Sequence, residues 1–190
     1  VSVTTTLNNS FGSKVFVEKS GFFLNNEMDD FSSKPGYPNF FGVIGSEANS
    51  IQPNKRMLSA MTPTIVLKNE KPHLILGSPG GPSIITSVFQ TILNVIEYEM
   101  NVNEAVSSPR FHHQWYPDLI VMEKEAYSNE LDSILKDKNY LIVKLPIEED
   151  TLGVYKRSDI GAVDAILIND NGKVFGGADL RREHHSSTID

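Results

Sequence analysis

Two adjacent glycines, Gly80 and Gly81, lie in the sequence LGSPGGPS (residues 76–83) between an apolar run and an amphipathic segment. This pattern predicts a strand that passes through a glycine turn into a helix. The first N–H groups of a helix have no partner within it and carry partial positive charge. Adjacent glycines also let a ligand approach the backbone closely. The motif therefore indicates a site for an anion or a developing oxyanion, although a purely structural turn has the same pattern.

A second group of polar residues follows a short apolar segment. Residues 24–31 (LNNEMDDF) contain three carboxylates and two amides, which could bind an ammonium group or a metal, or could form a solvated turn. Residues 54–64 (NKRMLSAMTPT) could hold a carboxylate through hydroxyl and backbone groups, or could simply lead a loop into a strand. We expect no metal site at His112 and His113, because adjacent side chains point in different directions in regular structure, nor at His184 and His185.

Composition narrows the class of protein. The chain has 190 residues, a formal net charge of −7 and no cysteine. An acidic chain without a basic cluster argues against nucleic acid and anionic membrane surfaces as partners. The absence of cysteine excludes disulfides, zinc-thiolate sites and a cysteine nucleophile. No apolar run reaches the roughly 18 residues of a membrane span. We expect a single α+β domain over residues 1–190.

The elements that position the N-terminal motifs are a strand and a loop. Residues 1–7 alternate between apolar and polar side chains, which predicts a strand with one polar face. A second short strand is expected over residues 19–24. Residues 31–53 are rich in Pro, Gly, Ser and Asn, and a loop of this length is usually functional. Phe40 and Phe41 at its tip suggest a lid over a pocket.

The rest of the chain predicts strands covered by helices. We expect hairpins over residues 64–77 and 162–177, and further strands over 119–122 and 141–145. A helix over residues 83–100 would bury a wide apolar face that includes Ile85 and Phe89. Asn101 and Glu104 resemble a capping box for a second helix that ends near residue 109. A third helix over 128–138 would turn Leu131, Ile134 and Leu135 inward.

Several motifs together resemble one family. The strings TTTLN (4–8), LNNEMDDF (24–31), NKR (54–56) with LS (58–59), GSPGG (77–81) and PRFH (109–112) occur in the order and spacing of the small subunit of γ-glutamyltranspeptidase. The resemblance covers essentially the whole chain. It implies the αββα sandwich of an N-terminal nucleophile hydrolase and a precursor that cleaves itself into a large and a small subunit. It also implies γ-glutamyl transfer from glutathione and related amides to water or to acceptor amino acids or peptides, with no cofactor.

The resemblance assigns a role to each matching position. Thr6 would orient the nucleophile; Asn8, Glu27 and Asp30 would hold the substrate α-ammonium; and Ser59 would hold its α-carboxylate. Gly80 and Gly81 would form the oxyanion hole through backbone N–H groups. Residues 35–46 would form the lid, with Phe41 as the gating aromatic. Relatives in bacteria imply a periplasmic or secreted location.

The chain departs from the family pattern at two places. The family nucleophile is a threonine that precedes the strand expected here at residues 1–7, so we expect it upstream of Val1 and expect the chain alone to be inactive. Ala60 stands where the family often has a second serine, which removes a hydrogen bond worth about 0.5–1.5 kcal/mol. We also expect the isolated chain to self-associate through the surface that a large subunit would cover.

Two other functions fit the same pattern. One is a related acylase that acts on poly-γ-glutamate or on β-lactam side chains. The β-lactam acylase is the less favoured of these two, because the chain retains a complete pocket for an amino-acid head group. The other is a γ-glutamyl-binding domain without catalysis.

Overall fold

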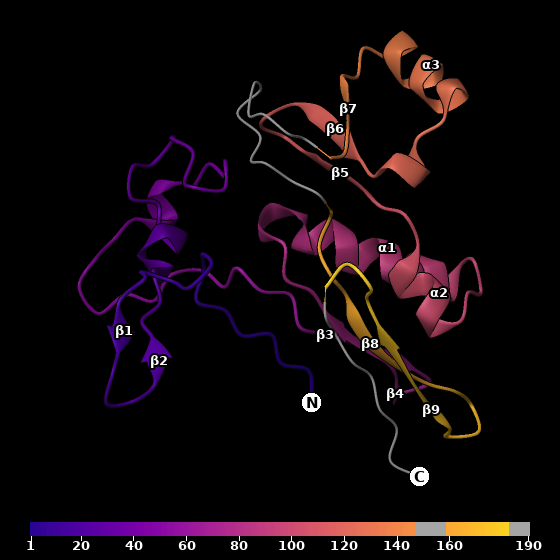
Figure 1. Ribbon diagram of the computed structural model, residues 1–190, viewed down its shortest axis with the longest axis horizontal. Coiled ribbons are helices and arrows are strands. Elements are labelled where there is room, and N and C mark those ends of the chain that lie inside the picture. The colour runs from indigo at the N-terminus through magenta and orange to yellow at the C-terminus, as the bar shows by residue number, and fades with distance from the viewer. Residues whose placement is uncertain (147–158, 183–190) are drawn as a thin grey trace. The chain divides into compact units, whose positions relative to one another are not determined.

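The computed structural model describes residues 1–146 and 159–182 (Figure 1). Their contacts divide them into two compact units, one with residues 1–4 and the chain from 61 onward, the other with residues 5–60. His184 and His185 lie outside the described residues. The expectation of a single domain over 1–190 stays a prediction.

A four-stranded antiparallel sheet organises the larger unit. Its order is β3-β4-β8-β9, formed by β3 (Thr64–Lys68), β4 (Lys71–Gly77), β8 (Asp164–Ile168) and β9 (Val174–Ala178). Both expected hairpins are confirmed. Asn69 and Glu70 join β3 to β4 with φ values of 51° and 62°, which is the left-handed backbone of a tight two-residue hairpin turn.

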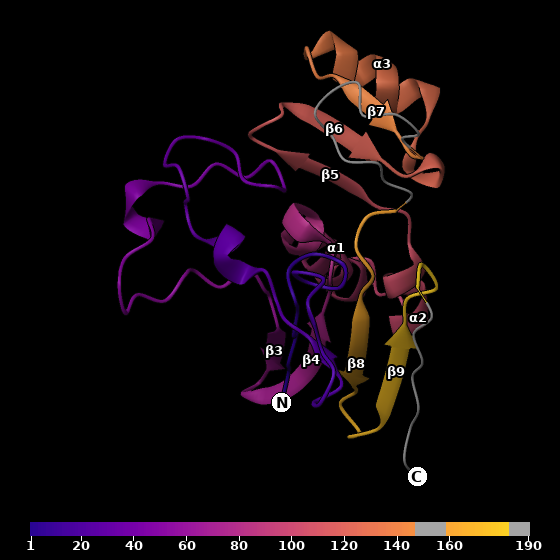
Figure 2. The same cartoon turned by 60° about the vertical axis from the view of Figure 1, so that its left-hand side comes forward.

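Two helices cover one face of this sheet, α1 (Ile84–Ile96) and α2 (Val102–Ser107) (Figure 2). The capping box at the start of α2 is confirmed, because the Asn101 side chain accepts from the Glu104 N–H and the Glu104 carboxylate accepts from the Asn101 N–H. Alternate strand residues face opposite sides. Three apolar side chains on the other face are exposed, and they are Ile65, Leu67 and Ile166.

The first helix differs from the expectation in length and in its buried face. It is preceded by the short turn η3 (Gly81–Ser83) and ends at Ile96, because Glu99 adopts a left-handed φ of 53°. Ile85 and Phe89, expected in the apolar face, are 66% and 56% exposed. Ser87 and Thr91 take part of the buried face instead, with their hydroxyls bonded to backbone carbonyls. Hydrogen bonds of this kind let small polar residues pack inside the fold.

A second sheet of order β5-β6-β7 completes the larger unit. It consists of β5 (Phe111–Gln114), β6 (Leu119–Met122) and β7 (Ile142–Lys144), with the turn η4 (Lys124–Ala126) and the helix α3 (Asn129–Asp137) between the last two strands. The expected strands and third helix are confirmed, whereas β5 was not expected as a strand. Ile134 is 47% exposed, so its expected inward position is wrong.

The smaller unit contains little regular structure. A short hairpin pairs β1 (Phe16–Val17) with β2 (Phe22–Phe23), so the expected strand over 19–24 is reduced to two residues. The turns η1 (Glu27–Asp30) and η2 (Glu47–Asn49) follow. Residues 31–53 form the long loop that was expected, apart from η2.

Residues 1–7 do not form the expected strand. Ser2 Oγ donates to the Leu76 carbonyl (3.1 Å), while Val1 and Val3 are exposed. Residues 1–4 therefore contact β4 through polar side chains. Because β3 and β8 already pair with both edges of β4, no backbone ladder remains there for residues 1–4 to join. In the described part of the chain, no helix is long and apolar enough to cross a bilayer.

Candidate active site

The glycine turn lies where the sequence predicted it, between the end of β4 and the start of α1. Gly80 has φ 141° and Gly81 has φ 57°, two conformations that side chains disfavour. Pro82 has no N–H, and the Ser83 N–H donates to the Gly80 carbonyl (3.3 Å). The peptide N–H groups that begin this turn are therefore those of the two glycines.

Buried hydroxyls hold the turn in place. Ser83 Oγ donates to the Gly80 carbonyl (2.8 Å), and Ser78 Oγ donates to the Pro79 carbonyl (2.7 Å). Both serines are at most 1% exposed. A backbone fixed in this way can present N–H groups to an oxyanion without reorganising, which is the basis of oxyanion stabilisation.

The structure brings Thr6 and Asn8 beside the acidic turn in the smaller unit. Thr6 Oγ1 accepts from the Asn8 N–H (2.8 Å), and Asn8 Nδ2 donates to the Asn26 carbonyl (3.1 Å). The Asn9 N–H in turn donates to Asn26 Oδ1 (3.0 Å). Residues 6–9 are thus joined to the residue that precedes Glu27.

Two carboxylates lie together on η1. Glu27 and Asp30 are three residues apart, which places them on the same side of a 3₁₀ turn. Partial burial, followed by the hydrogen bond and charge of Asp30, raises the pKa of Glu27 to about 7. Glu27 is therefore protonated in a substantial fraction of the free protein near neutral pH. A bound ammonium group would supply a positive charge opposite the Glu27 and Asp30 carboxylates.

The loop expected to form the lid is tied to the same turn. The Asp29 carboxylate accepts from the Phe40 N–H (3.3 Å), and Asn39 Oδ1 accepts from the Phe41 N–H (3.0 Å). The rings of Phe40 and Phe41 pack edge to face with centroids 5.2 Å apart. Phe41 is half-buried. The tip of the loop is therefore held by contacts with Asp29 and with its own residue Asn39.

Asn49, which no sequence motif marked, connects the segment of Ser59 to Asp30. Its Nδ2 donates to the Asp30 carbonyl (2.7 Å), and its Oδ1 accepts from the Leu58 N–H (3.1 Å). Ser59 itself is exposed. The only signal in the sequence was an amide within a loop, which is too common to be informative.

The structure groups six of the expected site residues in the smaller unit, namely Thr6, Asn8, Glu27, Asp30, Phe41 and Ser59. Gly80 and Gly81 belong to the larger unit. Among the described residues, no group of three His, Asp or Glu side chains could hold a metal ion. His112 bonds to Thr86 and Gln114, whereas His113 bonds to Asp118.

The model of one protein family, described as gamma-glutamyltranspeptidase, matches residues 1–189. The chain belongs to the γ-glutamyltranspeptidase family. The glutathione hydrolase proenzyme of Escherichia coli (strain K12) is 44% identical over 181 residues, which are 95% of this chain and 29% of that protein. The chain thus spans less than a third of the length of this relative.

Solved structures of the γ-glutamyltranspeptidase family share the fold. A mutant of Helicobacter pylori γ-glutamyltranspeptidase matches with a TM-score of 0.85 and 48% identity, over 96% of this chain and 93% of that chain. The Bacillus anthracis transpeptidase enzyme CapD matches with a TM-score of 0.70 over 100% and 92%, but its 22% identity shows the fold alone. The expected α+β fold of an N-terminal nucleophile hydrolase is confirmed.

Proposed function

We propose that the full-length protein transfers or hydrolyses the γ-glutamyl group of glutathione and related amides through a threonine acyl-enzyme. The observation that carries this proposal is the Glu27–Asp30 pair beside Asn8, in a chain that the family model matches over residues 1–189. Two adjacent carboxyl groups, once ionised, suit the α-ammonium of a γ-glutamyl substrate.

The remaining residues supply the other contacts. Ser59 binds the α-carboxylate, Thr6 orients the nucleophile, and the N–H groups of Gly80 and Gly81 stabilise the oxyanion of the tetrahedral intermediate. The loop that ends in Phe41 closes over the substrate. Acceptor amino acids or peptides, or water, then take the acyl group.

The partner of this chain is the large subunit of the same precursor. Support comes from the greater length of the relatives and from the exposed apolar face at Ile65, Leu67 and Ile166, which a second sheet would cover in an αββα sandwich. The isolated chain should self-associate through this face. A monomer at every concentration in light scattering would contradict that expectation. A periplasmic or secreted location is supported by the family resemblance, and fractionation of expressing cells tests it.

A chromogenic γ-glutamyl anilide tests the function. The mature full-length protein should release the anilide from the γ-linked substrate and leave the α-linked glutamyl anilide intact. The two substrates contain the same glutamate and differ only in which of its carboxyl groups forms the amide bond to the aniline. Equal release from both, or release from neither, would refute the proposal. A binding domain without catalysis would bind γ-glutamyl compounds without turnover.

The pKa of Glu27 predicts a pH-dependent affinity. Because the pKa is raised to about 7, Glu27 is protonated in the free protein below that pH and ionised above it. An ionised Glu27 is needed to bind an ammonium group, so the KM for the γ-glutamyl anilide should rise as the pH falls from 8 to 6, by about tenfold per pH unit at the acidic end. Glu27→Gln should have a higher KM at pH 8 and little dependence on pH.

Glu47→Gln is the matched control, because Glu47 is an exposed carboxylate in the same unit. Its KM should follow the wild-type pH profile. A Glu27→Gln protein with the full wild-type dependence would show that another group titrates.

A further inference from the structure

Gly161 packs directly against the glycine turn. A Cβ atom on Gly80 would lie 2.9 Å from Gly161 Cα, which is backbone and cannot move aside easily. Gly161 has φ 66°, and a Cβ atom there would overlap Ser87 Oγ of α1 and lie 2.9 Å from Ser78 Oγ. Residues 160–162 therefore form a floor between the glycine turn and the first turns of α1. We call residues 160–162 the floor segment.

Two buried hydroxyls connect the floor segment to the turn. The Ala162 N–H donates to Ser78 Oγ (3.1 Å), whose own proton goes to the Pro79 carbonyl next to Gly80 (2.7 Å). Ser87 Oγ makes a longer bond to the Ile160 carbonyl (3.4 Å). A displacement of the floor segment would therefore be passed to the turn through short, buried contacts.

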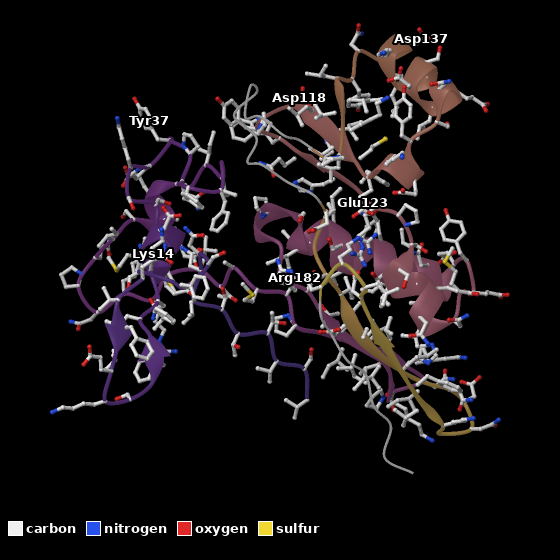
Figure 3. All side chains as sticks on the ribbon, in the orientation of Figure 1. Lys14, Tyr37, Asp118, Glu123, Asp137 and Arg182 are labelled. Carbon is white, nitrogen blue, oxygen red and sulfur yellow. The ribbon has the colours of Figure 1, made fainter. Side chains whose placement is uncertain are left out.

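Charged side chains fix the floor segment from the other side. The Ile160 N–H donates to Glu123 Oε1 (3.0 Å), and the Ile160 carbonyl accepts from Arg110 (3.0 Å). The next residue after the segment, Val163, donates its N–H to Asp179 (2.8 Å). Figure 3 labels Glu123, which follows β6.

These charges pair with one another and form one cluster. Arg110 binds Asp179 (2.7 Å), and Arg181 binds both Glu123 and Asp179. Arg110 and Asp179 are at most 1% exposed. We call Arg110, Glu123, Asp179 and Arg181 the charge cluster. Because each guanidinium and carboxylate has a charged partner and backbone partners, the cluster is a rigid anchor.

We propose that the floor segment sets the geometry of the Gly80–Gly81 turn, with Gly161 and Ser78 as positioning residues for catalysis. This inference rests on the proposed function, in which the turn binds the oxyanion. Oxyanion donors must lie at hydrogen-bond distance from the oxygen that develops charge, and a small displacement is costly. The residues expected to bind the head group lie in the other unit. Disturbing the floor should lower kcat and leave KM nearly unchanged.

Gly161→Ala in the full-length protein tests the inference, with Gly172→Ala as the matched control. Gly172 has φ 77°, so both substitutions impose backbone strain, but a Cβ on Gly172 meets nothing within 4 Å. Gly161→Ala should lower kcat for the γ-glutamyl anilide by about 10- to 100-fold with KM within about twofold of wild type. The double variant Gly161→Ala, Ser87→Ala lacks the hydroxyl that the new methyl group overlaps, so it should recover part of the lost kcat. An unchanged kcat, or an equal loss in Gly172→Ala, would overturn the inference.

Ser78→Ala decides the question if Gly161→Ala yields no folded protein. It removes the hydroxyl that joins Ala162 to the turn, and Thr91→Val removes an equally buried hydroxyl from α1 as its control. Only Ser78→Ala should lower kcat, and equal kcat in both variants would overturn the inference.

Hydrogen exchange separates this inference from the proposed function. The amides of Gly80, Gly81 and Ser83 should exchange faster in whichever of Gly161→Ala and Ser78→Ala folds than in its control, whether or not the protein turns over the anilide. Wild-type protein without turnover would refute the function alone. Unchanged exchange at the turn would refute the floor segment as its support.

Discussion

Asp179→Ala is expected to lower the free energy of unfolding by about 3–5 kcal/mol, the range for removing one partner of a buried ion pair. Asp179 is 0% exposed, and its loss would leave Arg110, 1% exposed, without its 2.7 Å partner. The N–H groups of Val163 and Arg181 would lose their acceptors as well. Urea unfolding of the full-length protein measures the change.

Asp170→Ala is the control for this experiment. Asp170 pairs with Lys68 at 2.9 Å, but both side chains are at least half exposed. Exposed ion pairs contribute little to the free energy of unfolding, so the urea midpoint of Asp170→Ala should stay close to that of the wild-type protein. Equal midpoints for the two variants would show that the charge cluster does not stabilise the fold.

The effect of Asp179→Ala should also depend on pH. Burial opposes ionisation of Asp179, but the Arg110 charge and the N–H groups of Arg181 and Val163 outweigh burial and hold its pKa below the usual value. The stability that this carboxylate contributes is therefore fully present above about pH 4 and is lost as the pH falls through the folded-state pKa. The difference in the free energy of unfolding between Asp179→Ala and the wild-type protein should therefore decrease at acidic pH.

Gly80→Ala is expected to lower kcat by about 10²–10³-fold, the effect of losing one oxyanion-hole donor. The residue has φ 141°, and its new Cβ would lie 2.9 Å from Gly161 Cα. The turn must shift to relieve this contact, which displaces the N–H groups of both glycines. Binding of the head group should change little, so we expect KM to stay close to the wild-type value.

Gly21→Ala controls for backbone strain, because Gly21 has φ 72° and open space around it. Steady-state kinetics should show near wild-type kcat for this variant. Urea midpoints measured in parallel would reveal whether Gly80→Ala acts by unfolding. A Gly80→Ala protein with wild-type kcat would remove the turn from the mechanism.

Local patterns predicted the elements whose signals are local. The capping box at Asn101 and both hairpins followed from residues close in sequence, and the structure confirms them. Residues 1–7 show the limit of such patterns. Alternation describes a residue's preference for a strand, but pairing also needs a free edge, and both edges of β4 are occupied.

Long-range contacts were beyond local patterns. The individual roles of the site residues were assigned from the family resemblance, which recognises strings such as LNNEMDDF as a whole. The charge cluster was missed because its members are distant in sequence, with Glu123 and Arg181 58 residues apart. Ser87 and Thr91 were missed because a polar residue in a helix gives no sign of the carbonyl that it will meet inside the fold.

The charge cluster also has a consequence for biosynthesis. A ribosome makes the glycine turn and α1 well before it makes Asp179 and Arg181, which bind Arg110 and Glu123. Until those two residues leave the exit tunnel, Arg110 and Glu123 lack the ion-pair partners that they have in the folded chain. The nascent chain therefore cannot complete the support beneath its glycine turn until Asp179 and Arg181 have been made. The order of synthesis delays the finished turn until the sheet has received β9.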